Sequence, residues 1–200
     1  MAPKHDSSVS RRDFIKSTGV GGLATGLLSQ AELRAQQGVR EAGPGAVPIQ
    51  LTINGRRHDL TVEPRVTLLD AVRNRLEITG VKRVCDRGAC GACTMMLDGR
   101  TVYACSILAI EAQGRDIRTV ESLGTESALH PVEEAFCEHD ALMCGFCTPG
   151  FVMATTALLE QEPNPSPDAV RHALDGNICR CGTYKKVVEA ALATRGVRRG

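Results

Sequence analysis

The amino-acid sequence predicts an α+β protein in which a small sheet domain precedes a helical domain. Apolar and polar residues alternate over Pro48–Ile53 and His58–Val62, on either side of an Asn-Gly pair that is typical of a β-hairpin turn. After about residue 130 the spacing becomes helical, and prolines stand where helices begin. Eight cysteines form two groups of four with different spacings, one in each half. A metal group bound by four cysteines could therefore cross-link and stabilise each small domain.

The sheet domain is expected over residues 48–122. Asn54-Gly55 turns the first hairpin, because both residue types accept positive φ. Thr67 is expected to cap a helix with the sequence TLLDAVRNRLE, which Gly80 ends. Three further short strands are expected: Thr94–Leu97, Thr101–Cys105 and Asp116–Thr119. A helix lying across a small mixed sheet is an α+β arrangement.

The helical domain is expected over residues 130–195, after a crossing segment at 121–129. The sequence EPNPSP at 162–167 should stop a helix abruptly, because proline cannot continue one. Four helices are predicted: Pro131–His139, Pro149–Glu160, one from Ser166 or Pro167 to Ala173, and Thr183–Ala193. Each half is small enough that its apolar core alone is marginal, so cross-linking through a metal group would stabilise it.

The first 31 residues are predicted to be a twin-arginine signal peptide. Ser10–Lys16 reads SRRDFIK, and a glycine-rich apolar run at 19–28 follows that is too short to anchor in a bilayer. Ser29-Gln30-Ala31 fits cleavage after Ala31, with cleavage after Ala35 as an alternative. Residues 32–47 are expected to form a linker. The chain should therefore be exported folded to the periplasm, with no membrane span once the signal is removed.

The first cysteine set is Cys85, Cys90, Cys93 and Cys105. Its Cys-x4-Cys-x2-Cys spacing with a later fourth cysteine is the plant-type 2Fe–2S arrangement. Gly88 and Gly91 permit tight turns that bring backbone N–H groups close to sulfur. Basic side chains nearby, at positions 82, 83 and 87, would raise the reduction potential or else be solvated surface. Zinc is the alternative, but structural zinc sites favour two CxxC-like pairs.

The second set is Cys144, Cys147, Cys179 and Cys181, and it is less specific on its own. A CxxC with a CxC could bind zinc, and the CxxC alone could be a redox dithiol. An exported chain with nine cysteines could also be a disulfide scaffold. Export in the folded state favours clusters assembled in the cytoplasm. Cys137 is left over, and we expect it to be a small buried apolar residue.

Taken together, the motifs resemble the small iron–sulfur subunit of the xanthine dehydrogenase/aldehyde oxidase family of molybdenum hydroxylases. The matching stretches are CDRGACGACTMMLDG, Cys105, LHPVEEAF, CGFCTPGF and GNICRCGTY, which span residues 48 to about 193. With its leader, the chain resembles the periplasmic aldehyde oxidoreductases of bacteria. The resemblance implies a ferredoxin-like β-grasp domain that holds one 2Fe–2S cluster and a four-helix domain that holds a second.

The resemblance also implies partners and a function. Electrons from a molybdopterin-type cofactor would leave singly through the helical cluster and then the ferredoxin-like cluster to FAD or another acceptor. Molybdenum and FAD would sit on partner subunits, so at least one large molybdenum-binding partner is expected. The alternative is a free-standing two-cluster carrier. No substrate chemistry is expected on this chain, and its net charge of +1 and lack of tryptophan do not favour nucleic acid. Met143 stands where the family usually has Gln.

Overall fold

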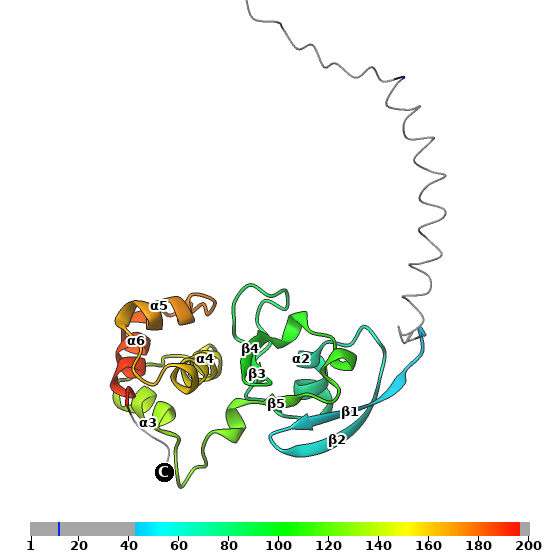
Figure 1. Cartoon of the computed structure of the whole chain (residues 1–200), viewed down its shortest axis with the longest axis horizontal. Coiled ribbons are helices and arrows are strands. Elements are labelled where there is room, and N and C mark those ends of the chain that lie inside the picture. Colours follow the sequence, from blue (N-terminus) through cyan, green and yellow to red (C-terminus); the bar gives the residue numbers. More distant parts are fainter. Residues whose placement is uncertain (1–11, 13–42, 197–200) are drawn as a thin grey trace, which may run out of the picture. The chain divides into compact units, whose positions relative to one another are not determined.

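A mixed five-stranded sheet and a group of α-helices make up the computed structural model, so the predicted α+β class is confirmed (Figure 1). The structure describes residue 12 and residues 43–196. The described residues from 43 onward belong to one compact unit. Apart from Arg12, the predicted signal peptide lies outside the described residues, as does the predicted linker up to residue 42.

The sheet has the strand order β2-β1-β5-β3-β4. Its strands are β1 (Val47–Ile53), β2 (Arg56–Val62), β3 (Thr94–Leu97), β4 (Arg100–Tyr103) and β5 (Asp116–Arg118). The central strand β5 runs parallel to β1, whereas the other pairs are antiparallel. Asn54 and Gly55 turn the first hairpin with φ of 51° and 75°, as their positive-φ tolerance predicts. The late, short strand β5 therefore joins the two hairpins into one sheet.

The helix across the sheet is shorter than predicted. Thr67 caps it through Asp70 N–H···Oγ1 at 3.2 Å, and α2 (Leu68–Asp70) continues as a π-helical segment, Ala71–Arg75. Glu77 has a φ of 58° and the Arg73 guanidinium donates to the carbonyl groups of Thr79 and Val81, so the chain has left the helix before Gly80. These donations from the Arg73 side chain hold the segment that follows the helix against the helix end.

The sheet core is apolar and lies between the strands and the α2 segment. Leu51, Ile53, Leu68 and Met95 are fully or almost fully buried in it. Three 3-10 turns complete this half: Ala104–Ser106, Ala109–Ala112 and Val120–Ser122. Cys105, predicted at the end of a strand, lies in the first of these turns because β4 ends at Tyr103.

Four α-helices follow, close to the predicted positions. They are α3 (Pro131–Glu138), α4 (Thr148–Gln161), α5 (Pro167–Leu174) and α6 (Tyr184–Ala193). His130 caps α3 by accepting from Val132 N–H at 3.2 Å, and Ser166 caps α5 by accepting from Ala169 N–H at 3.1 Å. Helix α4 packs on α3 and α5 and also on β3 (Figure 1). Eight of its residues are buried because it is covered from both the helical and the sheet side.

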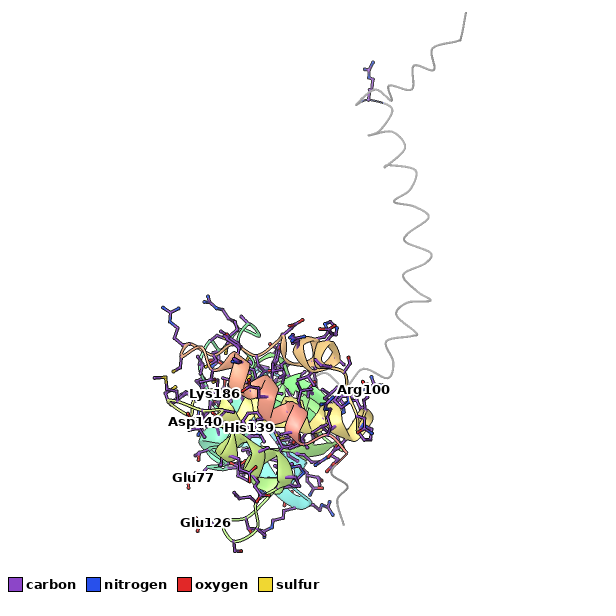
Figure 2. All side chains as sticks on the ribbon, turned by 90° about the vertical axis from the view of Figure 1, so that its left-hand side faces the viewer. Glu77, Arg100, Glu126, His139, Asp140 and Lys186 are labelled. Carbon is purple, nitrogen blue, oxygen red and sulfur yellow. The ribbon has the colours of Figure 1, made fainter. Side chains whose placement is uncertain are left out.

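Polar contacts fasten the helices to their surroundings. Arg118 of β5 makes a bidentate ion pair with Glu160 of α4, at 2.9 and 3.0 Å. Lys186 of α6 pairs with Asp140 in the loop after α3 (Figure 2). Cys137 is exposed, so the prediction of a buried apolar role was wrong: it lies on the outer face of α3, whereas Phe136 beside it is buried. None of the helices in the described part of the chain is long and apolar enough to cross a membrane.

Candidate iron–sulfur centres

The first cysteine set lies at one end of the β3–β4 hairpin. Because Thr94 of β3 is paired with Tyr103 of β4, Cys93 before one strand and Cys105 after the other reach the same end. The backbone joins them there, with Ala104 N–H donating to the Cys93 carbonyl at 3.3 Å. Cys93 and Cys105 are buried, and Cys85 and Cys90 are half-buried. Strand pairing thus brings Cys105 to the end of the hairpin where Cys93 lies. Cys85 and Cys90 lie in the loop that precedes Cys93.

The loop that carries Cys85 and Cys90 directs backbone N–H groups at sulfur. Gly88 N–H donates to Cys105 Sγ at 3.1 Å, and Ala89 N–H donates to Cys85 Sγ at 3.4 Å. The loop takes positive φ at Asp86, Gly88 and Gly91, with values of 55°, 70° and 69°. Gly88 and Gly91 were expected to serve such turns. Donation to sulfur stabilises the thiolate form, which is the form that binds metal.

Burial and hydrogen bonds affect the thiols of this set in opposite directions. Burial tends to raise the pKa of Cys85, but donation from the backbone N–H groups of Arg87 and Ala89 and contact with the Cys90 thiol bring that pKa to about 7. Burial raises the pKa of Cys93 to about 12, and its contact with the Cys105 thiol adds to the rise. Among the thiols of this set, Cys90 thus lowers the pKa of Cys85, and Cys105 raises the pKa of Cys93.

The second cysteine set lies where loops meet helix starts. Cys144 and Cys147 precede α4, and Cys179 and Cys181 precede α6. Burial first, and then contact with Cys179, raise the pKa of Cys147 to about 12. For Cys179, burial opposes ionisation, but the Thr183 hydroxyl at 3.2 Å and the Thr183 backbone lower the pKa to about 7.

The other two thiols of this set face outward. Cys144 and Cys181 are exposed, whereas Cys147 is half-buried and Cys179 is buried. The Phe146 backbone N–H, and then contact with the Cys181 thiol, lower the pKa of Cys144. This set therefore consists of two pairs, one inner and one at the surface.

The four thiols of each set fit a two-iron cluster. In a 2Fe–2S cluster each iron takes two of the four protein thiolates. All nine cysteines are free thiols. Each set thus offers the four thiolates that one 2Fe–2S cluster needs, and the assignment of the eight cysteines as ligands stays a prediction.

Two of the basic side chains near the first set bond to groups other than sulfur. Arg83 pairs with Asp70 at 2.8 Å and with Asp86 at 2.9 Å, and Lys82 donates to the Thr79 carbonyl at 2.8 Å. Arg83 therefore links the loop to the α2 segment. The N–H groups are the donors that the structure shows directed at sulfur.

No individual role was predicted for Asn177, although it lies in the GNICRCGTY stretch. Asn177 is buried, and the segment around it contacts the loop of the first cysteine set. The local indication was Gly176-Asn177, a turn-forming pair that Ile178 separates from the CRC motif. Contact with residues over 80 positions earlier is not visible in such a pattern.

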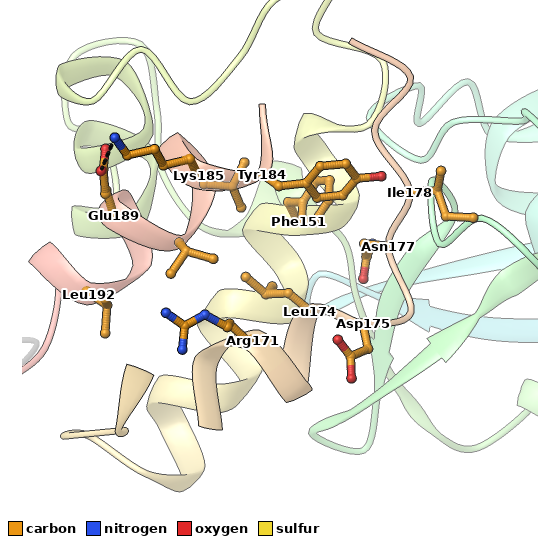
Figure 3. A pocket seen from close by; sticks show the side chains of 12 residues that line it. Phe151, Arg171, Leu174, Asp175, Asn177, Ile178, Tyr184, Lys185, Glu189 and Leu192 are labelled. Atoms are coloured by element: carbon orange, nitrogen blue, oxygen red, sulfur yellow. Dashed lines mark ion pairs between the residues drawn. The ribbon is translucent and has the colours of Figure 1, made fainter. Parts of the chain in front are cut away.

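A pocket of about 670 Å³ lies between α5 and α6, beside the second set (Figure 3). Apolar side chains such as Phe151, Leu174 and Leu192 line it, and Lys185 and Glu189 form an ion pair at 3.8 Å on its wall. Ile178 and Tyr184 belong to both this pocket and the exposed apolar residues near Cys179. The pocket therefore extends an apolar surface around the second set.

Comparison with known families agrees with this description of the site. A model described as "2Fe-2S iron-sulfur cluster binding domain" matches residues 51–123, and one described as "[2Fe-2S] binding domain" matches residues 119–192. The two halves of the chain are thus those of an iron–sulfur protein.

Sequence relatives of the chain indicate which class of iron–sulfur protein it belongs to. The chain is 49% identical over 150 residues to the nicotine 6-hydroxylase small subunit of Paenarthrobacter nicotinovorans, which covers 75% of this chain and 90% of that protein. It is 36% identical over 201 residues to the aldehyde oxidoreductase iron-sulfur-binding subunit PaoA of Escherichia coli (strain K12), which covers 93% and 88%.

Among solved structures, quinoline 2-oxidoreductase from Pseudomonas putida 86 matches with a TM-score of 0.71 and 40% identity, over 74% of this chain and 91% of that one. Aldehyde oxidoreductase from Desulfovibrio gigas matches with a TM-score of 0.71 and 38% identity, over 74% of this chain and 17% of its own longer one. The chain belongs to the family of small iron–sulfur subunits of molybdenum hydroxylases, and it is the iron–sulfur subunit of an oxidoreductase.

Proposed function

We propose that this chain relays single electrons from a molybdopterin site on a large partner subunit to FAD or another acceptor. The route enters at the second cysteine set, passes to the first, and leaves from there. The ligands are the two quartets already described, Cys85, Cys90, Cys93 and Cys105, and Cys144, Cys147, Cys179 and Cys181. The β-grasp half holds one 2Fe–2S cluster and the four-helix half holds the other.

The observation that carries this proposal is a group of exposed apolar side chains next in sequence to cysteines of the second set. Met143, Phe146 and Ile178 are 72%, 52% and 52% exposed, and they are sequence neighbours of Cys144, Cys147 and Cys179. Large apolar side chains gathered around one site mark a protein interface. A redox partner that docks there comes close to the exposed thiols of Cys144 and Cys181, which suits electron entry at this point.

Bound clusters would supply one-electron redox chemistry at both sets. The chain's own groups hold and tune them. Four thiolates give a cluster net negative charge, and N–H donors such as those of Gly88 and Ala89 offset it, which favours the reduced form. Met143 cannot donate the hydrogen bond that Gln would at this position. At this point the partner would therefore meet an apolar side chain.

Export through a twin-arginine pathway is part of the proposal. The SRRDFIK sequence at 10–16 supports it. Changing both Arg11 and Arg12 to Lys should leave the protein in the cytoplasm with its iron bound. Periplasmic protein at the unaltered level in that variant would contradict export by this route.

Purification of the tagged chain from cells that also make its partners tests the function. We expect a large subunit and molybdenum to be recovered with it, together with about four irons and four labile sulfides per chain. Full iron with no large subunit would favour the free-standing carrier. Zinc in place of iron would end the electron-transfer proposal.

A further inference from the structure

The segment Gly176–Ile178 joins the second cysteine set to the first. Ile178 N–H donates to the Cys90 carbonyl at 2.9 Å, and the Tyr103 hydroxyl donates to the Gly176 carbonyl at 2.9 Å. Ile178 directly precedes Cys179, and Cys90 belongs to the first set. One hydrogen bond therefore connects the backbone of a cysteine in one quartet to the neighbour of a cysteine in the other.

Asn177 lies at the centre of this contact, on the chain between Asp175 and Ile178 (Figure 3). It is 5% exposed, and its amide Nδ2 donates to the Gly91 carbonyl at 2.9 Å and lies 3.3 Å from Thr94 Oγ1. A buried amide is costly unless its hydrogen bonds are made. Its partners lie next to Cys90 and Cys93, so the amide specifies one alignment of the two loops.

The two loops meet at very short range. A Cβ atom on Gly91 would overlap the Gly176 carbonyl oxygen and lie 2.6 Å from Asn177 Nδ2. A Cβ atom on Gly150, in the first turn of α4, would overlap the Gly91 carbonyl oxygen and lie 2.9 Å from Asn177 Nδ2. Three segments therefore pack closely around the Asn177 side chain: the loop of the first set, the start of α4 and the segment before Cys179.

We infer that Asn177 is a positioning residue for electron transfer between the two cysteine sets. By holding Gly91 and Thr94, it keeps the Ile178 N–H···Cys90 carbonyl hydrogen bond intact as the through-bond connection between them. This inference deepens the proposed function and rests on it. Clusters held by the two sets would exchange one electron, with the cluster at the second set oxidised by one unit and the cluster at the first reduced by one unit. No bond or proton would change.

Electron tunnelling weakens steeply with distance, so small changes in the alignment of the loops should be measurable. Asn177→Asp replaces the donor amide with a carboxylate oxygen, an acceptor that faces the Gly91 carbonyl. Asn177→Ala removes the donor amide and puts nothing in its place. The matched control is Glu160→Gln, which weakens another contact between the two halves. Glu160 lies roughly 20 Å further along α4 than Cys147, as 13 helical residues rise about that far.

The test uses the purified complex of each variant. Low-temperature EPR of the fully reduced protein reports the magnetic interaction between the two clusters, and flash reduction reports the rate of transfer between them. In both Asn177 variants we expect near-normal iron, a weaker magnetic interaction and transfer slowed about tenfold, as for other residues that orient metal ligands. Glu160→Gln should keep the normal interaction and rate.

Iron-loaded Asn177→Asp with the normal interaction and rate would overturn the inference. If the Asn177 variants do not take up iron, Tyr103→Phe removes a neighbouring donor from the same contact, and an unchanged interaction and rate in that variant would overturn it equally. Failure of the proposed function looks different. An iron-free unaltered chain, or one that recovers no partner, would contradict the relay itself before any variant is compared.

Discussion

Replacing Gly91 with Ala should destabilise the protein more than a similar change at any open turn. Gly91 has a φ of +69°, and its missing Cβ leaves room for the Gly176 carbonyl and the Asn177 amide. Left-handed backbone costs roughly 1–2 kcal/mol for a residue with a Cβ. Forcing an atom into a packed contact costs about 1–3 kcal/mol more. The sum is about 3 kcal/mol, which lowers the melting temperature by about 6–12 °C for a chain of this size.

Substitutions at Gly99 and Gly150 separate the backbone cost from the steric cost. Gly99 has a φ of +75° with nothing near its missing Cβ, so Gly99→Ala should show only the backbone cost, about 2–8 °C. Gly150 has ordinary helical backbone but overlaps the Gly91 carbonyl, so Gly150→Ala should show the steric cost, offset by about 1 kcal/mol of gained helix propensity.

Thermal unfolding of the iron-loaded protein measures all three variants under identical conditions. Visible absorption followed during the same scan shows whether iron is lost before or together with folding. We expect Gly91→Ala to unfold at the lowest temperature of the three. If Gly91→Ala melts no lower than Gly99→Ala, the close approach of the two loops does not constrain the protein and the steric argument is wrong.

Three further predictions concern the site, the surface and pH. Cys147→Ser should retain about two irons in place of about four and lose one EPR signal, and normal iron would remove Cys147 from the ligands. Met143→Asp should abolish recovery of the large subunit with iron unchanged; Leu129→Asp, at a residue 48% exposed elsewhere, is the control, and equal losses would refute a local interface. The Arg115 side chain lowers the pKa of Asp98, so the stability it adds is present above pH ~4 and lost as pH falls. Asp98→Asn should therefore flatten melting temperature against acid pH, and an unchanged slope would contradict this.

Much of the fold followed from local pattern. The Asn54-Gly55 turn was predictable because few residue types accept its backbone, and the starts of α3 and α5 were predictable from proline and capping residues. The extent of the α2 segment was not predictable, since the local spacing indicated a regular helix through Glu77, whereas the chain takes π-helical backbone from Ala71 to Arg75 and then positive φ at Glu77. The outward face of Cys137 was missed for a similar reason, because local pattern gives a helix's spacing but not which side is covered.

The sequence by itself predicted which atoms bind metal and determined the family of the chain. Eight cysteines in two spacings, glycines between them and a relatedness to iron–sulfur subunits are all readable without coordinates. Only the tertiary structure decided how the thiols pair, which pair reaches the surface, and that Asn177 lies between the two sets. These features arise from contacts between residues up to 86 positions apart. The spacing of cysteines along the chain indicates what a loop can bind, whereas tertiary packing decides which other segments contact that loop.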